Sequence, residues 1–325
     1  MKVLSLFDGI SCGQIALERA GINVDKYYAS EIDKYAIQIA QKNYPNTIQL
    51  GDVSKIGYHK KGFLYSEKGY IKTKIDLLIG GSPCQDLSIA KKDRQGLDGA
   101  RSGLFWEYAR ALKEIQPKYF LFENVASMPK EAKAVISEVL GVEPILINSA
   151  LVSAQQRKRL YWTNIKGIEQ PKDKGIYLKD ILESGVVQEE KSETIKFQYA
   201  KTAQANYFRQ GSFHAQMIFE PIILSNSTLP QSQRVYSVQG KSICLNSGGG
   251  GGGAKTGLYK IDLLDGDYII RKLTPIECER LQTLPEGYTE GISNTQRYKC
   301  IGNGWTVDVI AWILSYLGGT YVDRF

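Results

Sequence analysis

The sequence is poor in histidine, and its few cysteines are scattered. Its 325 residues include two histidines, His59 and His214, and five cysteines that form no Cys-x-x-Cys pair. A structural zinc site or a disulfide framework needs more closely spaced ligands than these. We therefore expect no metal site, and a reducing compartment such as the cytoplasm.

Long apolar runs are also missing. No run approaches the roughly 20 residues that a membrane-spanning helix needs, so we expect no membrane association. Residues 1–7 read as a strand rather than as a secretory signal, because they lack a long apolar core and a small-residue cleavage site. The net charge of +7 is modest, and it suits nucleic-acid binding only if the charge gathers in patches.

The apolar pattern divides the chain into two kinds of sequence. Residues 1 to about 165 alternate short apolar strands with helical patterns, which predicts a doubly wound, mostly parallel, Rossmann-like α/β sheet. From about 170 to 270 this alternation is lost, and Gln, Ser, Asn and Gly become common. We therefore expect one domain of residues 1–170 plus 290–325, and a smaller, mainly β or irregular domain of residues 171–289.

The predicted elements can be given by residue range. Strands are predicted at 3–7, 27–30, 48–50, 75–79, 119–122, 145–150, 160–165 and 258–263. Helices are predicted at 14–20, from about 34 to 44, and at 102–115, 273–281 and 307–317.

Polar residues follow the first three predicted strands, at the edge where parallel sheets bind ligands. The turn 8–13 offers unpaired amides to a polar ligand, Glu31 suits ribose hydroxyls, and Asp52 suits an adenine amino group. Ser11 and Cys12 replace the middle glycine of G-x-G-x-x-G, which disfavours a pyrophosphate. The set therefore favours adenosine without phosphates, as in S-adenosylmethionine, although each acid alone is equally well a surface carboxylate.

Three further segments carry candidates for chemistry. Cys84 follows an apolar strand and the turn 80–83; alone, it reads as a half-buried turn thiol. Glu123 stands at a predicted strand end, where it could protonate a base ring or begin a helix. Arg157 and Arg159 reach one pocket if they alternate on a strand face, and otherwise form a solvated basic edge.

Six short motifs occur in one order along nearly the whole chain. They are Phe7-Asp8-Gly9, Pro83-Cys84-Gln85, Glu123-Asn124-Val125, Gln156-Arg157-Lys158-Arg159, the segment 271–278 and Gly302-Asn303-Gly304. In order and spacing they resemble the DNA (cytosine-5) methyltransferases of bacterial and phage restriction-modification systems. Gly304 stands where that family often has serine, which puts a side-chain contact at this position in doubt.

The resemblance implies a methyltransferase fold and a covalent mechanism. The thiolate of Cys84 would add to C6 of a flipped-out cytosine, Glu123 would hold N3, and Arg159 would bind O2 with support from Arg157. C5 would then take the methyl group of S-adenosylmethionine. The implied cofactor contacts are Phe7, Asp8, Gly9, Ile10, Glu31, Ile32, Asp52, Pro83, Asn303 and Gly304.

The resemblance also implies how double-stranded DNA is bound. Residues 85–101 would form a loop that closes over the flipped base, and 171–289 would hold the target-recognition domain and hinge. Gln231 would fill the space left by the base, and Arg234 would read a guanine edge. The implied DNA contacts are Gln85, Ser88, Arg94, Arg101, Gln231, Arg234, Asn246 and Lys255.

The glycine run before Lys255 admits other interpretations. Residues 249–256 differ by one residue from a phosphate-binding P-loop, but a strand pattern rather than a helix follows them. We therefore interpret the run as part of a DNA-reading loop, with a flexible linker as the alternative.

Two rival functions remain for comparison. A nicotinamide-dependent oxidoreductase accounts for the sheet and Glu31, but not for Cys84, Glu123 and Arg159 together. A DNA-binding relative without activity predicts that Cys84→Ala changes nothing. We expect a monomer in the cytoplasm of a bacterial or phage-infected cell, and the resemblance allows a cognate restriction endonuclease that acts separately.

Overall fold

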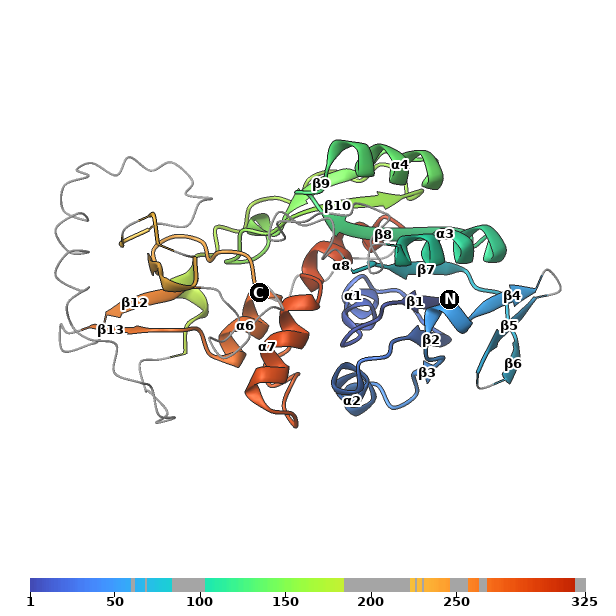
Figure 1. The fold of residues 1–325 in the computed structure, drawn as a ribbon, viewed down its shortest axis with the longest axis horizontal. Coiled ribbons are helices and arrows are strands. Elements are labelled where there is room, and N and C mark those ends of the chain that lie inside the picture. Colours follow the sequence, from blue (N-terminus) through green and yellow to red (C-terminus); the bar gives the residue numbers. More distant parts are fainter. Residues whose placement is uncertain are drawn as a thin grey trace. The chain divides into compact units, whose positions relative to one another are not determined.

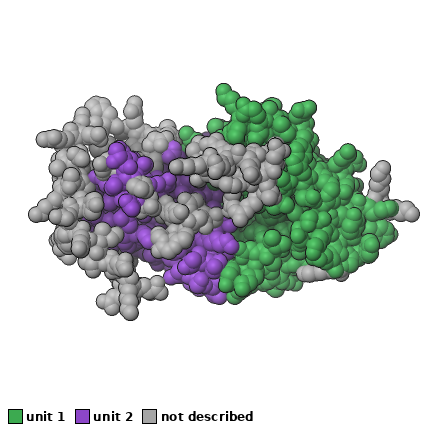
Figure 2. All heavy atoms as spheres, viewed as in Figure 1, with its two compact units in different colours: residues 1–148, 158–171, 304–325 green, residues 149–157, 172–303 purple. Residues whose placement is uncertain are grey.

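The computed structural model of the protein divides into two compact units. Unit 1 comprises residues 1–148, 158–171 and 304–325, and unit 2 comprises residues 149–157 and 172–303 (Figure 2). The structure describes residues 1–59, 62–67, 69–83, 103–183, 223–225, 227–229, 231–245, 257–262 and 268–318. In this described part of the chain, no helix combines the length and the apolar character that crossing a membrane requires.

Unit 1 is built on a seven-stranded sheet with the order β3-β2-β1-β7-β8-β10-β9 (Figure 1). Its strands are β1 (Lys2–Leu6), β2 (Lys26–Ser30), β3 (Ile48–Gln49), β7 (Leu77–Gly80), β8 (Tyr119–Val125), β9 (Ile145–Asn148) and β10 (Lys158–Thr163). Neighbouring strands from β3 to β8 are parallel, whereas β10 is antiparallel to both β8 and β9. The predicted doubly wound, mostly parallel sheet is confirmed, and β10 begins at the edge where β8 ends.

Helices cover both faces of this sheet. They are α1 (Cys12–Arg19), α2 (Lys34–Asn43), α3 (Leu104–Ile115), α4 (Lys130–Leu140) and α8 (Val307–Ser315). On the face covered by α3 and α4, the rings of Phe105 and Tyr108 pack on Phe122, which also contacts Trp162. Burying an aromatic ring contributes about 2–3 kcal/mol, so this cluster anchors α3 to β8.

On the other face, α1 and α8 pack against each other. A buried ion pair joins them, with Arg19 Nη1 2.6 Å from Asp308 Oδ1 and the two side chains 9% and 2% exposed. The partners lie 289 positions apart in the sequence. The last segment of unit 1 therefore completes a layer that begins with its first helix.

A small antiparallel sheet interrupts unit 1 after the 3-10 helix η1 (Val53–Lys55). Its strands are β4 (Gly57–His59), β5 (Phe63–Ser66) and β6 (Gly69–Lys72). The sequence pattern did not predict these strands. They are three or four residues long and contain at most one buried residue each, so they lack the buried apolar run that marks a central strand.

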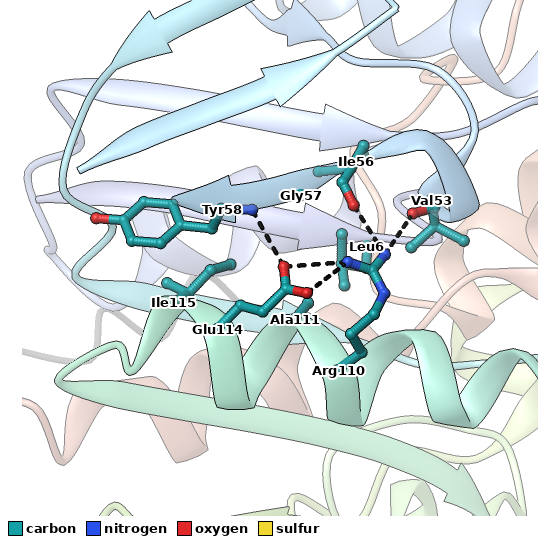
Figure 3. A pocket seen from close by; sticks show the side chains of 9 residues that line it. All are labelled: Leu6, Val53, Ile56, Gly57, Tyr58, Arg110, Ala111, Glu114 and Ile115. Carbon is teal, nitrogen blue, oxygen red and sulfur yellow. Dashed lines mark hydrogen bonds and ion pairs between the residues drawn. The ribbon is translucent and has the colours of Figure 1, made fainter. Parts of the chain in front are cut away.

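Arg110 of α3 fastens the start of this small sheet (Figure 3). Its guanidinium donates to the carbonyl oxygens of Val53 and Ile56 at 3.2 and 2.8 Å, and to the carboxylate of Glu114, which also accepts from the amide of Tyr58. The cavity beside these groups measures about 10 Å³. That is room for about one water molecule, so this cavity is not a substrate site.

Within the described residues, unit 2 has fewer strands and helices than unit 1. Its sheet has the order β11 (Val235–Ser237), β12 (Leu258–Asp262), β13 (Tyr268–Arg271). Its helices are α6 (Pro275–Leu281) and α7 (Asn294–Asn303), with 3-10 helices η3 (Ser149–Leu151), η4 (Leu178–Ile181) and η6 (Gln231–Gln233).

The start of α6 has a complete set of capping contacts. The hydroxyl of Thr274 accepts from the amide of Glu277, and the Glu277 carboxylate accepts in return from the amide of Thr274. Arg271 donates to both oxygens of the same carboxylate at 2.7 Å. The capping box with Pro275 as the first residue explains why the helix begins at this position.

Candidate active site

The turn after β1 has an unusual backbone, which the carboxylates of Glu31 and Asp8 hold in place. Phe7, Gly9 and Ser11 have φ angles of 58°, 58° and 60°. This left-handed region costs a non-glycine residue on the order of 1–2 kcal/mol, and such conformations persist where the surroundings impose them. Glu31, after β2, accepts from the amide of Gly9 through Oε2 at 2.8 Å.

Backbone amides bind both carboxylate oxygens of Glu31 and so orient its side chain. Its Oε1 accepts from the amides of Ile32 and Asp33 at 2.8 and 2.9 Å. A carboxylate has about four lone-pair positions, so three backbone donors leave capacity for a hydroxyl group. The side chain of Ile32 is 74% exposed and provides an apolar surface beside this carboxylate.

The third predicted acid lies at the end of the neighbouring strand. Asp52 accepts from the amide and the hydroxyl of Ser54, both at 2.9 Å, and these hydrogen bonds lower the pKa of Asp52. Ser30 donates to the carbonyl of Gly51 at 2.7 Å, which ties the end of β2 to the residue before Asp52. Two oriented carboxylates, an apolar side chain and a strained turn at one sheet edge fit an adenosine-containing ligand.

Asp8, within the turn, is buried among hydroxyl groups. Its Oδ1 accepts from the Tyr27 hydroxyl at 2.7 Å, and its Oδ2 accepts from the Ser11 hydroxyl. Burial raises the pKa of Asp8 from 3.8 to about 6, although hydrogen bonds from Ser11, Ser5 and Tyr27 lower it. The folded protein therefore holds the Asp8 proton to a higher pH than the unfolded chain does.

Asp8→Asn is expected to raise the unfolding free energy at pH 7, by at most about 3 kcal/mol. Because its folded pKa is raised, Asp8 favours the folded state most below pH 4 and progressively less as the pH rises to about 6. The asparagine of the variant cannot ionise, so its free energy of unfolding should not show this decrease as the pH rises. Urea titrations between pH 4 and pH 8 measure both effects.

The matched control for this experiment is Asp25→Asn. Asp25 is an exposed carboxylate whose pKa the N-terminal ammonium group lowers, so its replacement should not stabilise the protein at pH 7. An Asp8→Asn protein that is less stable than the wild type at pH 7, with an unchanged pH dependence, would contradict the assignment.

The structure brings Glu123 and Arg159 together. Glu123 lies within β8, two residues before its end, and not at the strand end that the sequence pattern predicted. Arg159 lies in β10, and its Nε is 2.9 Å from Glu123 Oε1, with the side chains 13% and 12% exposed. The antiparallel direction of β10 explains the pairing, because the start of β10 meets the end of β8.

The turn after β7 is fastened to β8 by Asn124. The Asn124 side-chain amide donates to the carbonyl and the hydroxyl of Ser82, both at 3.4 Å, and its oxygen accepts from the amide of Val125 at 2.8 Å. The sequence pattern assigned no role to Asn124, although its place in the Glu-Asn-Val motif was a signal. Pro83 is the last described residue of this turn, and Cys84 lies outside the described residues.

Arg157 precedes β10 and belongs to unit 2. Its guanidinium donates to the carbonyl oxygens of Leu245 at 2.9 Å and Gly302 at 3.2 Å, and the residue is 5% exposed. These bonds tie backbone segments of unit 2 together.

Two predicted cofactor contacts come directly after Gly302 in the sequence. Asn303 ends α7 in unit 2 and is exposed, whereas Gly304 is buried in unit 1.

Two predicted DNA contacts are described in unit 2. Gln231 is exposed in η6, and Arg234, between η6 and β11, is half-buried and donates from Nε to the carbonyl of Leu229 at 2.7 Å. The remaining ones lie outside the described residues: Gln85, Ser88, Arg94, Arg101, Asn246 and Lys255.

Comparison with known proteins gives the same family along nearly the whole chain. Residues 1–318 match the family described as C-5 cytosine-specific DNA methylase. The chain is 30% identical to the orphan methyltransferase M.Rho11sI of Bacillus phage rho11s, over 89% of this chain and 68% of that protein. It is 27% identical to the type II methyltransferase M.HhaI of Haemophilus parahaemolyticus, over 98% of this chain and 95% of that protein.

A solved structure shares the fold at lower identity. The methyltransferase EhMeth of Entamoeba histolytica superimposes with a TM-score of 0.66, at 18% identity, over 98% of this chain and 97% of that one. The family match and the relatives are methyltransferases, and they support that interpretation of the sequence rather than the oxidoreductase.

Proposed function

Since the chain belongs to the C-5 cytosine-specific DNA methylases and is a DNA (cytosine-5) methyltransferase, we propose which of its residues carry out the transfer. The observation that supports this proposal most is the ion pair between Glu123 and Arg159 beside the turn that leads to Cys84. A carboxylate and a guanidinium at this spacing can address two adjacent polar atoms on the edge of one pyrimidine ring.

The methyl donor of this proposal is S-adenosylmethionine. When bound, it supplies a methyl group on a positively charged sulfur, as an electrophile for cytosine C5. Glu31 would accept from the ribose hydroxyls, Asp52 from the adenine amino group, and Ile32 would cover the adenine ring. The remaining proposed contacts are Phe7, Asp8, Gly9, Ile10, Pro83, Asn303 and Gly304.

The proposed chemistry begins at Cys84. Its thiolate forms a bond to cytosine C6, and the electron pair of the C5–C6 double bond becomes available at C5. Glu123, in its protonated form, donates to N3, and Arg159 donates to O2, so both offset the negative charge that the ring acquires. After methylation, C5 loses its proton to water and the Cys84–C6 bond breaks, which restores the double bond and the thiolate.

The same proposal divides the work between two domains on double-stranded DNA. Residues 1–170 and 290–325 carry the cofactor and the chemistry, and residues 171–289 read the target sequence. In this assignment Arg157 is a support for the backbone, because its guanidinium binds the carbonyl groups of Leu245 and Gly302.

The proposal also covers the oligomeric state, the location and the functional partner of the enzyme. A monomer suffices, because one chain holds every proposed residue, and the cytoplasm is the proposed location. Phage relatives named as orphan methyltransferases and bacterial ones named as type II methyltransferases both match, so a separately acting endonuclease is proposed only as a functional partner.

Purified protein is expected to transfer tritium from methyl-labelled S-adenosylmethionine to unmethylated duplex DNA. Hydrolysis of the product DNA should place the label in 5-methylcytosine, and bisulfite sequencing should give the recognition sequence. The control substrate is the same DNA with every cytosine already methylated at C5. Label found in N4-methylcytosine or N6-methyladenine, or no transfer to any cytosine-containing duplex, would contradict the proposal.

A further inference from the structure

The second oxygen of the Glu123 carboxylate has a partner from the far end of the sequence. The indole Nε1 of Trp305 donates to Glu123 Oε2 at 3.1 Å, across 182 positions of the chain. Trp305 lies two residues before α8, and both residues belong to unit 1. With Arg159 Nε at 2.9 Å from Oε1, each oxygen of this carboxylate has its own donor.

The contact between Trp305 and Glu123 occupies space that a side chain at Gly81 would fill. A Cβ atom built on Gly81 would lie 2.8 Å from Glu123 Oε2 and 3.1 Å from Trp305 Nε1. Real Cβ atoms do not approach other atoms closer than 3.0 Å, so any side chain at this position would displace the carboxylate or the indole. Gly81, the residue after β7, thus has a role beyond the turn, since it makes room for the Trp305–Glu123 contact.

The two donors differ in charge, and this difference suggests what Trp305 does. A guanidinium attracts the ionised carboxylate strongly, whereas an indole N–H orients an oxygen without adding a positive charge. A group that must present a proton to cytosine N3 needs its carboxyl plane fixed, but a second cation would oppose its protonation. A neutral donor meets both needs.

We propose that Trp305 is a positioning residue, whose indole N–H sets the carboxyl orientation of Glu123 toward cytosine N3. The inference rests on the proposed role of Glu123 in the methyl transfer. It assigns to Trp305 an effect on the rate of the chemical step rather than on the binding of either substrate.

Trp305→Phe keeps an aromatic ring and removes the N–H group. We expect kcat for methyl transfer to fall by about tenfold, which corresponds to the loss of one hydrogen bond. The KM values for S-adenosylmethionine and for DNA should stay within about twofold of the wild type, because neither binding energy is removed. Steady-state kinetics with a duplex of known recognition sequence measures all three constants.

Trp312→Phe is the matched control. The indole of Trp312, in α8 of the same unit, donates to the carbonyl of Glu169 at 2.8 Å and not to Glu123. The substitution is chemically identical, and kcat should remain close to the wild-type value. A comparable fall in kcat for both variants would indicate a general effect of losing an indole N–H in this unit, and would overturn the inference.

A double-mutant cycle with Glu123→Gln separates the remaining outcomes. If Trp305 acts through the Glu123 carboxylate, adding Trp305→Phe to Glu123→Gln should change kcat by less than about twofold. Equal effects in both backgrounds, or a raised KM for S-adenosylmethionine with an unchanged kcat, would overturn the inference. An active wild type with an unimpaired Glu123→Gln variant would instead refute the proposed role of Glu123 itself.

Discussion

Replacing Cys84 with alanine is expected to reduce methyl transfer by at least about 10⁴-fold, because the proposed reaction has no other route to a nucleophilic C5. The described residues on either side of the thiol support its assignment. Gly81 lies against Glu123, and Ser82 is bonded to Asn124, so the turn that leads to Cys84 is attached to the strand that carries the proposed ring-binding carboxylate.

Two measurements test this prediction. Transfer of labelled methyl groups should vanish, and so should the covalent complex with a duplex containing 5-fluorocytosine, which blocks the release of the adduct. DNA binding should persist, because the substitution removes one sulfur atom. Turnover that survives in Cys84→Ala would point to a different nucleophile.

Cys278→Ala is the matched control for the thiol. Cys278 lies in α6, and burial raises the pKa of its thiol well above the ordinary value, so it stays protonated and unreactive. Its replacement should leave both methyl transfer and adduct formation intact. Loss of the adduct in this variant as well would show that the assay reports folding rather than the nucleophile.

Asp308→Ala is expected to destabilise the protein by about 3–5 kcal/mol, because it removes the carboxylate that neutralises a buried guanidinium. Arg19 and Asp308 are 2.6 Å apart, and their side chains are 9% and 2% exposed. With native stabilities of about 5–15 kcal/mol, such a loss is a large fraction of the total. Guanidinium chloride unfolding followed by circular dichroism measures it.

Glu67→Ala is the control for this prediction, since Lys55 and Glu67 are also 2.6 Å apart but their side chains are both 54% exposed. An exposed pair contributes little to stability, so burial rather than distance should set the difference between the variants. The double variant Arg19→Met, Asp308→Leu should recover most of the loss, because it removes the buried charge together with its partner. Equal costs for Asp308→Ala and Glu67→Ala would refute this account.

The parts of the fold that could be predicted are those with a strong local pattern. Residues 77–79 are an apolar run, residues 3–6 are apolar apart from Ser5, and both become central strands; the apolar spacing of 104–112 becomes α3. The three strands β4, β5 and β6 were missed because each has at most one buried residue. A central strand such as β7 is marked by a run of buried apolar residues, which these three strands lack.

The positions of the proposed site residues were predicted only in part. Glu31 and Asp52 follow the ends of β2 and β3, because a parallel sheet places strand ends together, whereas Glu123 lies within β8 and Arg159 lies in the antiparallel strand β10. The contact of Trp305 with Glu123 joins segments 182 positions apart, and no local pattern predicts a contact of that kind. The sequence held one indirect signal, Gly81. Its lack of a side chain makes room for this contact, but the sequence alone gave no reason for a glycine at this position.

The three-part sequence of unit 1 has a consequence for synthesis on the ribosome. Arg19 of α1 emerges 289 residues before Asp308 of α8, and the whole of unit 2 is made between them. At about 5–20 residues per second, this interval lasts roughly 15–60 s. During it the apolar face of α1 lacks its covering helix and Glu123 lacks its indole donor, so a nascent chain carries the catalytic motifs well before it can use them.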